Sequence, residues 1–267
     1  PIIEDVQING IKSEKLTDVL YDKINLKNRK SYIESLFLND LNLIKNIIKN
    51  SGYYFAEVKT NSILNKEQNS IRLIYDIDLG KRAKIQKIKF IGDKQIKDRK
   101  LRNIITSEES KFWKFISQSV YLNYDRIERD KRLLTNYYKN NGYYNVNITN
   151  SFVEFSNNNA FNLTFNIDAG EKFTFKSLNL ILSDDYDSKY FTEIKNSLNK
   201  LINKDYSLYK IEKILQEVDK IALTKQYQFI DALLEEKIIG KNELDITVRL
   251  QDNEKYYVEK INVYGNN

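Results

Sequence analysis

The chain has 267 residues, enough for two or three ordinary domains, and 41% of them are hydrophobic while 30% are charged. That composition is typical of a globular protein and excludes a disordered chain. No apolar run approaches the roughly 18 residues of a membrane-spanning helix. The chain starts at Pro1 with neither an initiator methionine nor a signal-like segment, so we interpret it as a piece of a longer protein.

Two residue types of many catalytic sites are missing. The chain contains no cysteine and no histidine, which removes disulfides, thiolate and imidazole metal ligands, cysteine nucleophiles and histidine bases. Carboxylates and lysines could still support chemistry, but here the carboxylates stand among lysines and asparagines in a pattern typical of solvated faces. The chain also lacks a glycine-rich phosphate loop and a G-x-S-x-G motif. We therefore expect a protein that is not an enzyme, with no catalytic residues, no metal site and no cofactor.

The net charge is +6, which could favour nucleic acid, anionic lipid or acidic partners. The lysines are spread along the chain rather than concentrated in one run, and they accompany many asparagines, isoleucines and tyrosines. An AT-rich coding sequence produces this combination. We favour that compositional explanation and expect no nucleic-acid partner.

Seven of the eight glycines fall in three repeating positions. The first position ends a short strand-like phrase, the second begins a tyrosine phrase such as NGYYNVNITN at 141–150, and the third closes an alternating strand. The second and third positions are 28 residues apart in each of the first two copies. We predict structural turns at these seven glycines: Gly10, Gly52, Gly80, Gly92, Gly142, Gly170 and Gly265.

A third copy fits the same template with its glycines replaced. SLNLILS at 177–183 matches the opening phrase, KQYQFID at 225–231 the tyrosine phrase, and VRLQDNEK at 248–255 the closing phrase. A fourth opening phrase, YYVEKINVYGNN, stands at 256–267. The repeating unit of 82 to 90 residues is too long for a solenoid repeat and suits a small domain.

Along each repeat, the spacing of hydrophobic residues changes in the same order, from that of a strand to that of helices and back to that of strands. In the first repeat an alternating strand ends at Gly10, a short helix begins at the N-cap Ser13, and a second helix carries an apolar stripe through Ile44 and Ile48. The tyrosine and closing phrases alternate apolar and polar residues, as half-buried strands do. A short link containing Gly240 predicts that the last two strands of the third repeat form an antiparallel hairpin.

This order of elements predicts an α+β fold of tandem two-layer domains. Each domain would run strand, helix, helix, strand, strand, with a three-stranded mixed sheet packed on the two helices. The predicted domains cover 1–81, 82–171, which has a longer helix–helix connection, and 172–255. Residues 256–267 would be the first strand of a following repeat.

The pattern resembles the POTRA repeats of BamA-type outer-membrane protein assembly factors, over the whole chain. The resemblance rests on IKFIGDK at 88–94, on the N/S-G-Y tyrosine phrases and on NIDAGEKF at 166–173. Gly92 and Gly142 are 50 residues apart, whereas Gly10 and Gly52 are 42 apart. An aromatic insertion in that longer segment is similar to the third repeat of five-repeat proteins, which indicates repeats two to four plus the start of repeat five.

The resemblance implies a periplasmic location, as part of an outer-membrane protein whose membrane barrel is absent from this fragment. It also implies binding without chemistry: the repeats would dock unfolded outer-membrane proteins and accessory lipoproteins of an assembly machine. The family's tyrosine strand lies at a sheet edge, where its unpaired N–H and C=O groups can pair with an extended partner by β-augmentation. In the second repeat this partner-binding edge strand would be Tyr143, Tyr144, Asn145, Val146, Asn147, Ile148 and Thr149.

The start of this phrase also has a simpler interpretation, since Gly142 and Tyr143 can form a helix-to-strand corner. The long connection of the second repeat contains SKFWKFISQ at 110–118. We predict a partner patch of Phe112, Trp113 and Phe115, because exposed aromatic side chains commonly anchor interfaces. The alternative is that these rings fold onto their own domain.

Two alternative functions remain open. A tandem RNA-binding module could combine small α+β domains with lysines and tyrosines, but it would need aromatic rings stacked outward on central strands. The POTRA region of a two-partner secretion transporter or of an import pore would share the repeats and differ in its clients.

Overall fold

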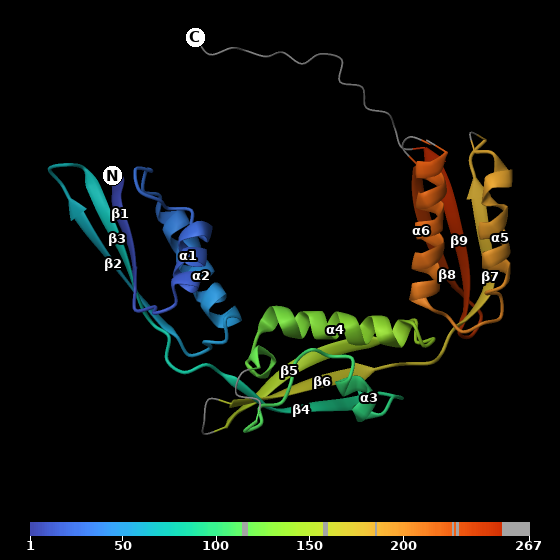
Figure 1. Cartoon of the computed structure of the whole chain (residues 1–267), viewed down its shortest axis with the longest axis horizontal. Coiled ribbons are helices and arrows are strands. Elements are labelled where there is room, and N and C mark those ends of the chain that lie inside the picture. The colour runs from blue at the N-terminus through green and yellow to red at the C-terminus, as the bar shows by residue number, and fades with distance from the viewer. Residues whose placement is uncertain (114–116, 157–159, 185, 226, 228–229, 253–267) are drawn as a thin grey trace, which may run out of the picture. The chain divides into compact units, whose positions relative to one another are not determined.

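The computed structural model describes residues 1–113, 117–156, 160–184, 186–225, 227 and 230–252 (Figure 1). Phe115, Gly265 and the fourth opening phrase lie outside the described residues. The chain groups into two compact units, one of residues 1–134 and 148–167, the other of 135–147 and the described residues from 168 onward. Within the described residues the strands form three three-stranded sheets.

The first sheet contains β1 (Ile2–Asn9), β2 (Glu57–Asn65) and β3 (Ser70–Asp78) in the order β1-β3-β2. β1 runs parallel to the central β3 and β2 runs antiparallel to it. Helices α1 (Glu14–Lys23) and α2 (Glu34–Asn50) cover one face of this sheet (Figure 1). The predicted mixed sheet with two helices on one face is therefore confirmed.

Local sequence explains these elements. The Ser13 hydroxyl accepts a hydrogen bond from the amide of Leu16, so the predicted N-cap of α1 is present. The alternating apolar residues of β3 are all buried, because side chains two residues apart point to the same face of a strand. They pack on Leu20 of α1 and on the Ile44 and Ile48 stripe of α2. The core of this sheet therefore forms between one strand face and two helix stripes.

The second sheet contains β4 (Lys84–Asp93), β5 (Asn147–Ser156) and β6 (Ala160–Asp168) in the order β4-β6-β5. Helix α4 (Tyr124–Lys139) lies along one face of this sheet (Figure 1). The other helices are short: α3 covers Asp98–Arg102 and a 3₁₀ turn covers Gln118–Val120. The long predicted connection between helices thus runs from Asn103 to Asn123, interrupted by that turn.

The third sheet lies in the second compact unit and contains β7 (Thr174–Leu182), β8 (Ile230–Ile239) and β9 (Glu243–Asp252) in the order β7-β9-β8. Its helices are α5 (Thr192–Asn199) and α6 (Leu208–Thr224), preceded by a 3₁₀ turn at Ser188–Phe191. β8 and β9 form the predicted antiparallel hairpin. Gly240 and Asn242 both have positive φ in its turn.

Candidate protein-binding site

The tyrosine phrases begin at tight helix-to-strand corners. Gly52 follows α2 with φ +94° and Gly142 follows α4 with φ +99°, values that glycine adopts without a steric penalty. In the first corner the amide of Tyr53 donates to the carbonyl of Ile48 at 3.1 Å. In the second, the amide of Tyr143 donates to the carbonyl of Tyr138 at 3.1 Å. These six-to-one hydrogen bonds are those of a Schellman helix end.

The other described glycines of the repeating positions also have positive φ. They differ in what surrounds them. A side-chain carbon would meet backbone atoms at two of the positions and open space at the other two. The crowded positions are Gly10 and Gly92, and the open ones are Gly80 and Gly170.

The predicted edge strand of the second repeat starts four residues too early. Tyr143–Val146 form a turn, and β5 begins at Asn147. The turn forms because the amides of Tyr143 and Val146 donate to Tyr138 and Tyr143, respectively, rather than to a neighbouring strand. Only Asn147, Ile148 and Thr149 of the predicted set lie in the strand, and β5 is at the sheet edge.

Side chains at the start of β5 alternate between the core and solvent. Val146 and Ile148 are buried, whereas Asn145, Asn147 and Thr149 are exposed. An exposed row of short polar side chains leaves the strand backbone accessible to another chain. The structure therefore places a polar, uncharged edge where the sequence predicted a partner-binding strand.

Tyr144 packs against the elements that lead into the third sheet. Its ring lies 5.0 Å from the ring of Tyr206 and 5.4 Å from that of Phe173, and its hydroxyl donates to the Glu236 carboxylate at 2.8 Å. The amide of Phe173 donates to the carbonyl of Gly142 at 2.9 Å. Burial, followed by the hydrogen bond to Glu236, raises the pKa of Tyr144 to about 12. Tyr144 therefore stabilises the joint between the second repeat and the third. The sequence did not indicate this role, because the partners of Tyr144 lie 29 to 92 residues away along the chain.

We expect replacement of Tyr144 by phenylalanine to lower the free energy of unfolding by about 1 kcal/mol at neutral pH, through loss of one hydrogen bond. Because the pKa of Tyr144 is raised on folding, its contribution is complete below the ordinary tyrosine pKa near 10 and is lost as pH rises through about 12. Urea denaturation of both proteins from pH 8 to 12 should show the difference shrinking across that window. A difference that is constant with pH would contradict the assignment.

The corner of the first repeat makes equivalent contacts within the first compact unit. The amide of Ala83 donates to the carbonyl of Gly52 at 2.7 Å. The Arg82 guanidinium lies 3.7 Å from the ring centroid of Tyr121 and 5.6 Å from that of Tyr53. The corner glycine thus accepts a hydrogen bond from the start of the next repeat in both cases, and the tyrosine phrase contributes rings to the joint.

The predicted aromatic patch is exposed where it is described. Phe112 is 88% exposed and Trp113 is 57% exposed. Their rings meet edge to face at 4.5 Å, and the Lys111 ammonium lies 5.5 Å from the Trp113 ring. Phe112 and Trp113 therefore contact each other while leaving most of their surface in water, and the patch stays a prediction.

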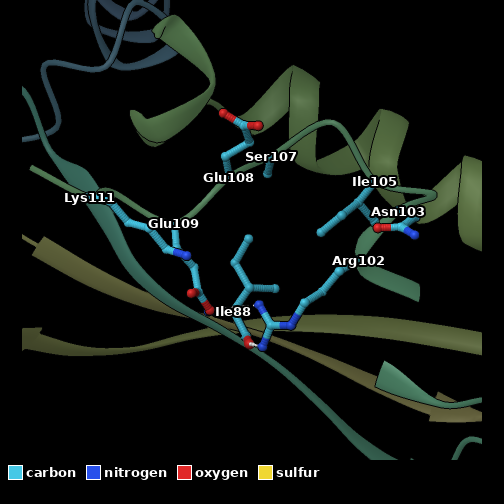
Figure 2. A pocket seen from close by; sticks show the side chains of 8 residues that line it. All are labelled: Ile88, Arg102, Asn103, Ile105, Ser107, Glu108, Glu109 and Lys111. Carbon is cyan, nitrogen blue, oxygen red and sulfur yellow. Dashed lines mark hydrogen bonds and ion pairs between the residues drawn. The ribbon is translucent and has the colours of Figure 1, made fainter. Parts of the chain in front are cut away.

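A cavity of about 400 Å³ lies between β4 and the connection that follows α3 (Figure 2). The Arg102 guanidinium is paired with the Glu109 carboxylate at 2.6 Å, and the amide of Ile88 donates to the same carboxylate at 2.9 Å. Burial raises the pKa of Glu109, but the hydrogen bonds from Ile88 and Arg102 outweigh it and lower the pKa overall.

Metal sites and membrane-spanning helices also bear on what the chain can do. Among the described residues, no group of three acidic side chains is placed to hold a metal ion. Within the same part of the chain, no helix is long and apolar enough to cross a membrane.

The fold and these sites define a class: tandem two-layer α+β repeats that expose strand edges. The family model POTRA, described as "Surface antigen variable number repeat", matches residues 1–80 and 83–170. The chain belongs to the POTRA family.

Known relatives extend the similarity over the whole chain. It is 23% identical to "Outer membrane protein assembly factor BamA" of Neisseria meningitidis serogroup B and 25% identical to the protein of the same name from Buchnera aphidicola. Both alignments cover 100% of this chain but 34% and 43% of the relatives, so the chain spans less than half of their length.

A solved structure shares the fold. The Haemophilus influenzae BamA POTRA3-5 structure has a TM-score of 0.58 and 15% sequence identity, and the match covers 94% of this chain and 96% of that one. The numbering of the repeats stays a prediction, because similarity at this identity shows the fold alone.

Proposed function

We propose that this chain is the periplasmic polypeptide-binding scaffold of an outer-membrane β-barrel assembly machine. It would dock unfolded outer-membrane proteins by adding their extended segments to exposed strand edges, and it would also dock accessory lipoproteins. The observation that carries this proposal is the edge position of β5, whose first residues expose only short uncharged side chains. Similarity to BamA proteins over the whole of this chain supports a role in outer-membrane protein assembly.

The expected affinity is low. Each hydrogen bond across a sheet edge contributes a net of roughly 0.5 to 1.5 kcal/mol. A few such bonds, offset by the entropy lost when the partner becomes ordered, give a weak and reversible complex. Reversibility suits a client that must move on to a membrane barrel. No chemical step is needed, so the proposed role is that of a binding protein.

A single charged substitution can test whether the edge of β5 binds a partner strand. Replacing the exposed Thr149 by lysine should weaken binding of a labelled outer-membrane β-strand peptide about fivefold, because a lysine on an edge strand disfavours pairing with another chain. Asn162→Lys is the control, since Asn162 lies on the central strand β6, which is paired on both sides. Fluorescence anisotropy measures both. Equal affinities for Thr149→Lys and the unaltered protein would count against this edge.

The alternatives are less well supported. Phe161 and Phe165 of the central strand β6 are buried, whereas an RNA-binding sheet needs such rings exposed for base stacking. The POTRA region of a two-partner secretion transporter or import pore shares the family match. Such a region would differ in its client. If the chain binds one defined client but does not bind outer-membrane strands in general, that result would favour a transporter or import pore.

A further inference from the structure

The opening strands β1, β4 and β7 occupy the other edge of each sheet. On β1 this edge is occupied by a side chain of α1. The hydroxyl of Tyr21 accepts a hydrogen bond from the amide of Ile8 at 3.0 Å and donates to the carbonyl of Val6 at 3.3 Å. We call such an edge closed, because the backbone groups that face away from the sheet already have partners.

The edge of β4 is closed by a different set of side chains. The amide of Ile88 donates to Glu109 at 2.9 Å, and Arg102 donates to the carbonyl of Ile88 at 2.6 Å; Figure 2 shows the three residues side by side. Further along the strand, the Lys94 ammonium donates to the carbonyl of Phe90 at 3.0 Å. The Arg102–Glu109 ion pair thus supplies a donor and an acceptor, as a neighbouring strand would.

The third opening strand has the same backbone geometry. The pairing register of β1 shifts between Ile3 and Asp5, and that of β7 shifts between Phe175 and Ser177. The amide of Phe175 donates to the carbonyl of Lys204, and the carbonyl of Phe175 accepts a hydrogen bond from the amide of Asn203. In the first repeat, Ile3 makes the same two hydrogen bonds with the carbonyl of Lys30 and the amide of Arg29. Leu178 and Leu180 therefore take the places of Val6 and Ile8, with the same backbone groups facing away from the sheet.

Among the described residues, β7 has no such closing side chain. Within the described part of the chain, no hydrogen bond from outside the sheet reaches the carbonyl of Leu178 or the amide of Leu180. We call this edge open. An open edge with unpaired N–H and C=O groups is a template for another strand.

Side-chain chemistry also distinguishes β7. The stretch from Leu178 to Leu182 reads LNLIL and carries no charge. The corresponding stretch of β4 contains Lys89, and that of β1, residues 6–10, reads VQING and is uncharged but more polar. Ile181 is 40% exposed, and Leu180 and Leu182 are only partly buried. Natural edge strands are commonly protected by charges. β4 has a charge and closing side chains, and β1 has a closing side chain alone, whereas this stretch of β7 has neither.

We infer that the edge of β7 binds an extended polypeptide segment with alternating apolar side chains, and that the closed edges of β1 and β4 do not. The partner's backbone would pair with Leu178 and Leu180, and its apolar side chains would contact the exposed Ile181. This inference rests on the proposed function for the class of partner, but it assigns a different strand and selects one repeat among three.

The test compares two equivalent positions. Ile181→Lys places a charge on the open edge, and Ile91→Lys places one at the corresponding position of β4, where the isoleucine is 48% exposed. The probe is a fluorescently labelled ten-residue peptide of alternating valine and threonine. We expect Ile181→Lys to weaken binding about tenfold and Ile91→Lys to change it less than about twofold. Equal effects of the two substitutions would overturn the inference.

Amide hydrogen exchange locates the bound strand. The Leu180 amide should exchange faster than the Ile8 amide in the free protein and become protected when the peptide binds. Tyr21→Phe removes the hydroxyl that closes β1, so the Ile8 amide should then gain peptide-dependent protection. Protection confined to β5 would overturn this inference and leave the proposed function standing. A lack of protection on any strand would overturn both.

Discussion

Replacing Gly10 by alanine is expected to lower the free energy of unfolding of the first sheet by about 3 to 4 kcal/mol. Gly10 has φ +88°, and an added side-chain carbon would lie 1.9 Å from the carbonyl oxygen of Ile77 on the central strand. Because that oxygen belongs to backbone, it cannot move without disturbing β3. Amide hydrogen exchange of β3 measures the effect in the repeat that carries the change.

Gly80→Ala is the matched control. Gly80 also has positive φ, +58°, but an added carbon would meet nothing within 4 Å. Its cost should be about 1 kcal/mol, which is the penalty of the backbone conformation alone. If both alanines cost the same, the close approach to Ile77 is not what requires glycine at position 10.

Replacing Asp40 by alanine should cost about 3 to 5 kcal/mol, because it leaves buried donors without a partner. Asp40 is fully buried on α2. Its carboxylate accepts hydrogen bonds from the amide and side chain of Asn25 and from the amide of Leu26, each at 2.8 Å. The substitution should release the loop between α1 and α2, which urea denaturation and amide exchange of residues 25 and 26 would detect.

The exposed Asp18 of α1 provides the control. Asp18→Ala removes a carboxylate from the same repeat and should change stability by less than about 0.5 kcal/mol. A small effect at Asp40 as well would show that water replaces the carboxylate at the loop.

Asp130 performs the equivalent task in the second repeat. It is fully buried and accepts hydrogen bonds from the amides of Thr106 and Ser107, at 2.6 and 3.0 Å. Sequence reasoning overlooked both aspartates, although each stands 12 residues before a corner glycine. That shared spacing was the available signal. A helical aspartate is usually solvated, so composition alone gave no reason to expect a buried one.

Much of the fold could be predicted because its determinants are local. Alternation along the closing phrases places Leu73, Leu163 and Ile246 in the core, and each is buried. The helix stripe of the third repeat likewise predicts the buried Ile211 and Val218 of α6. Side-chain direction in a strand or helix follows from backbone geometry within a few residues.

The proposed binding edges were only partly predictable. The tyrosine phrase reads as one continuous strand, yet its first four residues form a turn and Tyr144 contacts Glu236. Whether an edge is open or closed depends on side chains such as Tyr21 and Arg102, which reach the strand from another element. These contacts join residues that are 13 or more positions apart, and no local pattern records them.

The sequence by itself determined the order of strands and helices, the repeated glycine corners and the apolar faces that build each core, because periodicity and φ preferences act over short stretches of chain. Only the tertiary structure decided where β5 begins, which tyrosines contact the following repeat and which sheet edges have backbone groups without a partner among the described residues. Those properties depend on which backbone N–H and C=O groups are already bonded, and that is settled only when distant segments pack together.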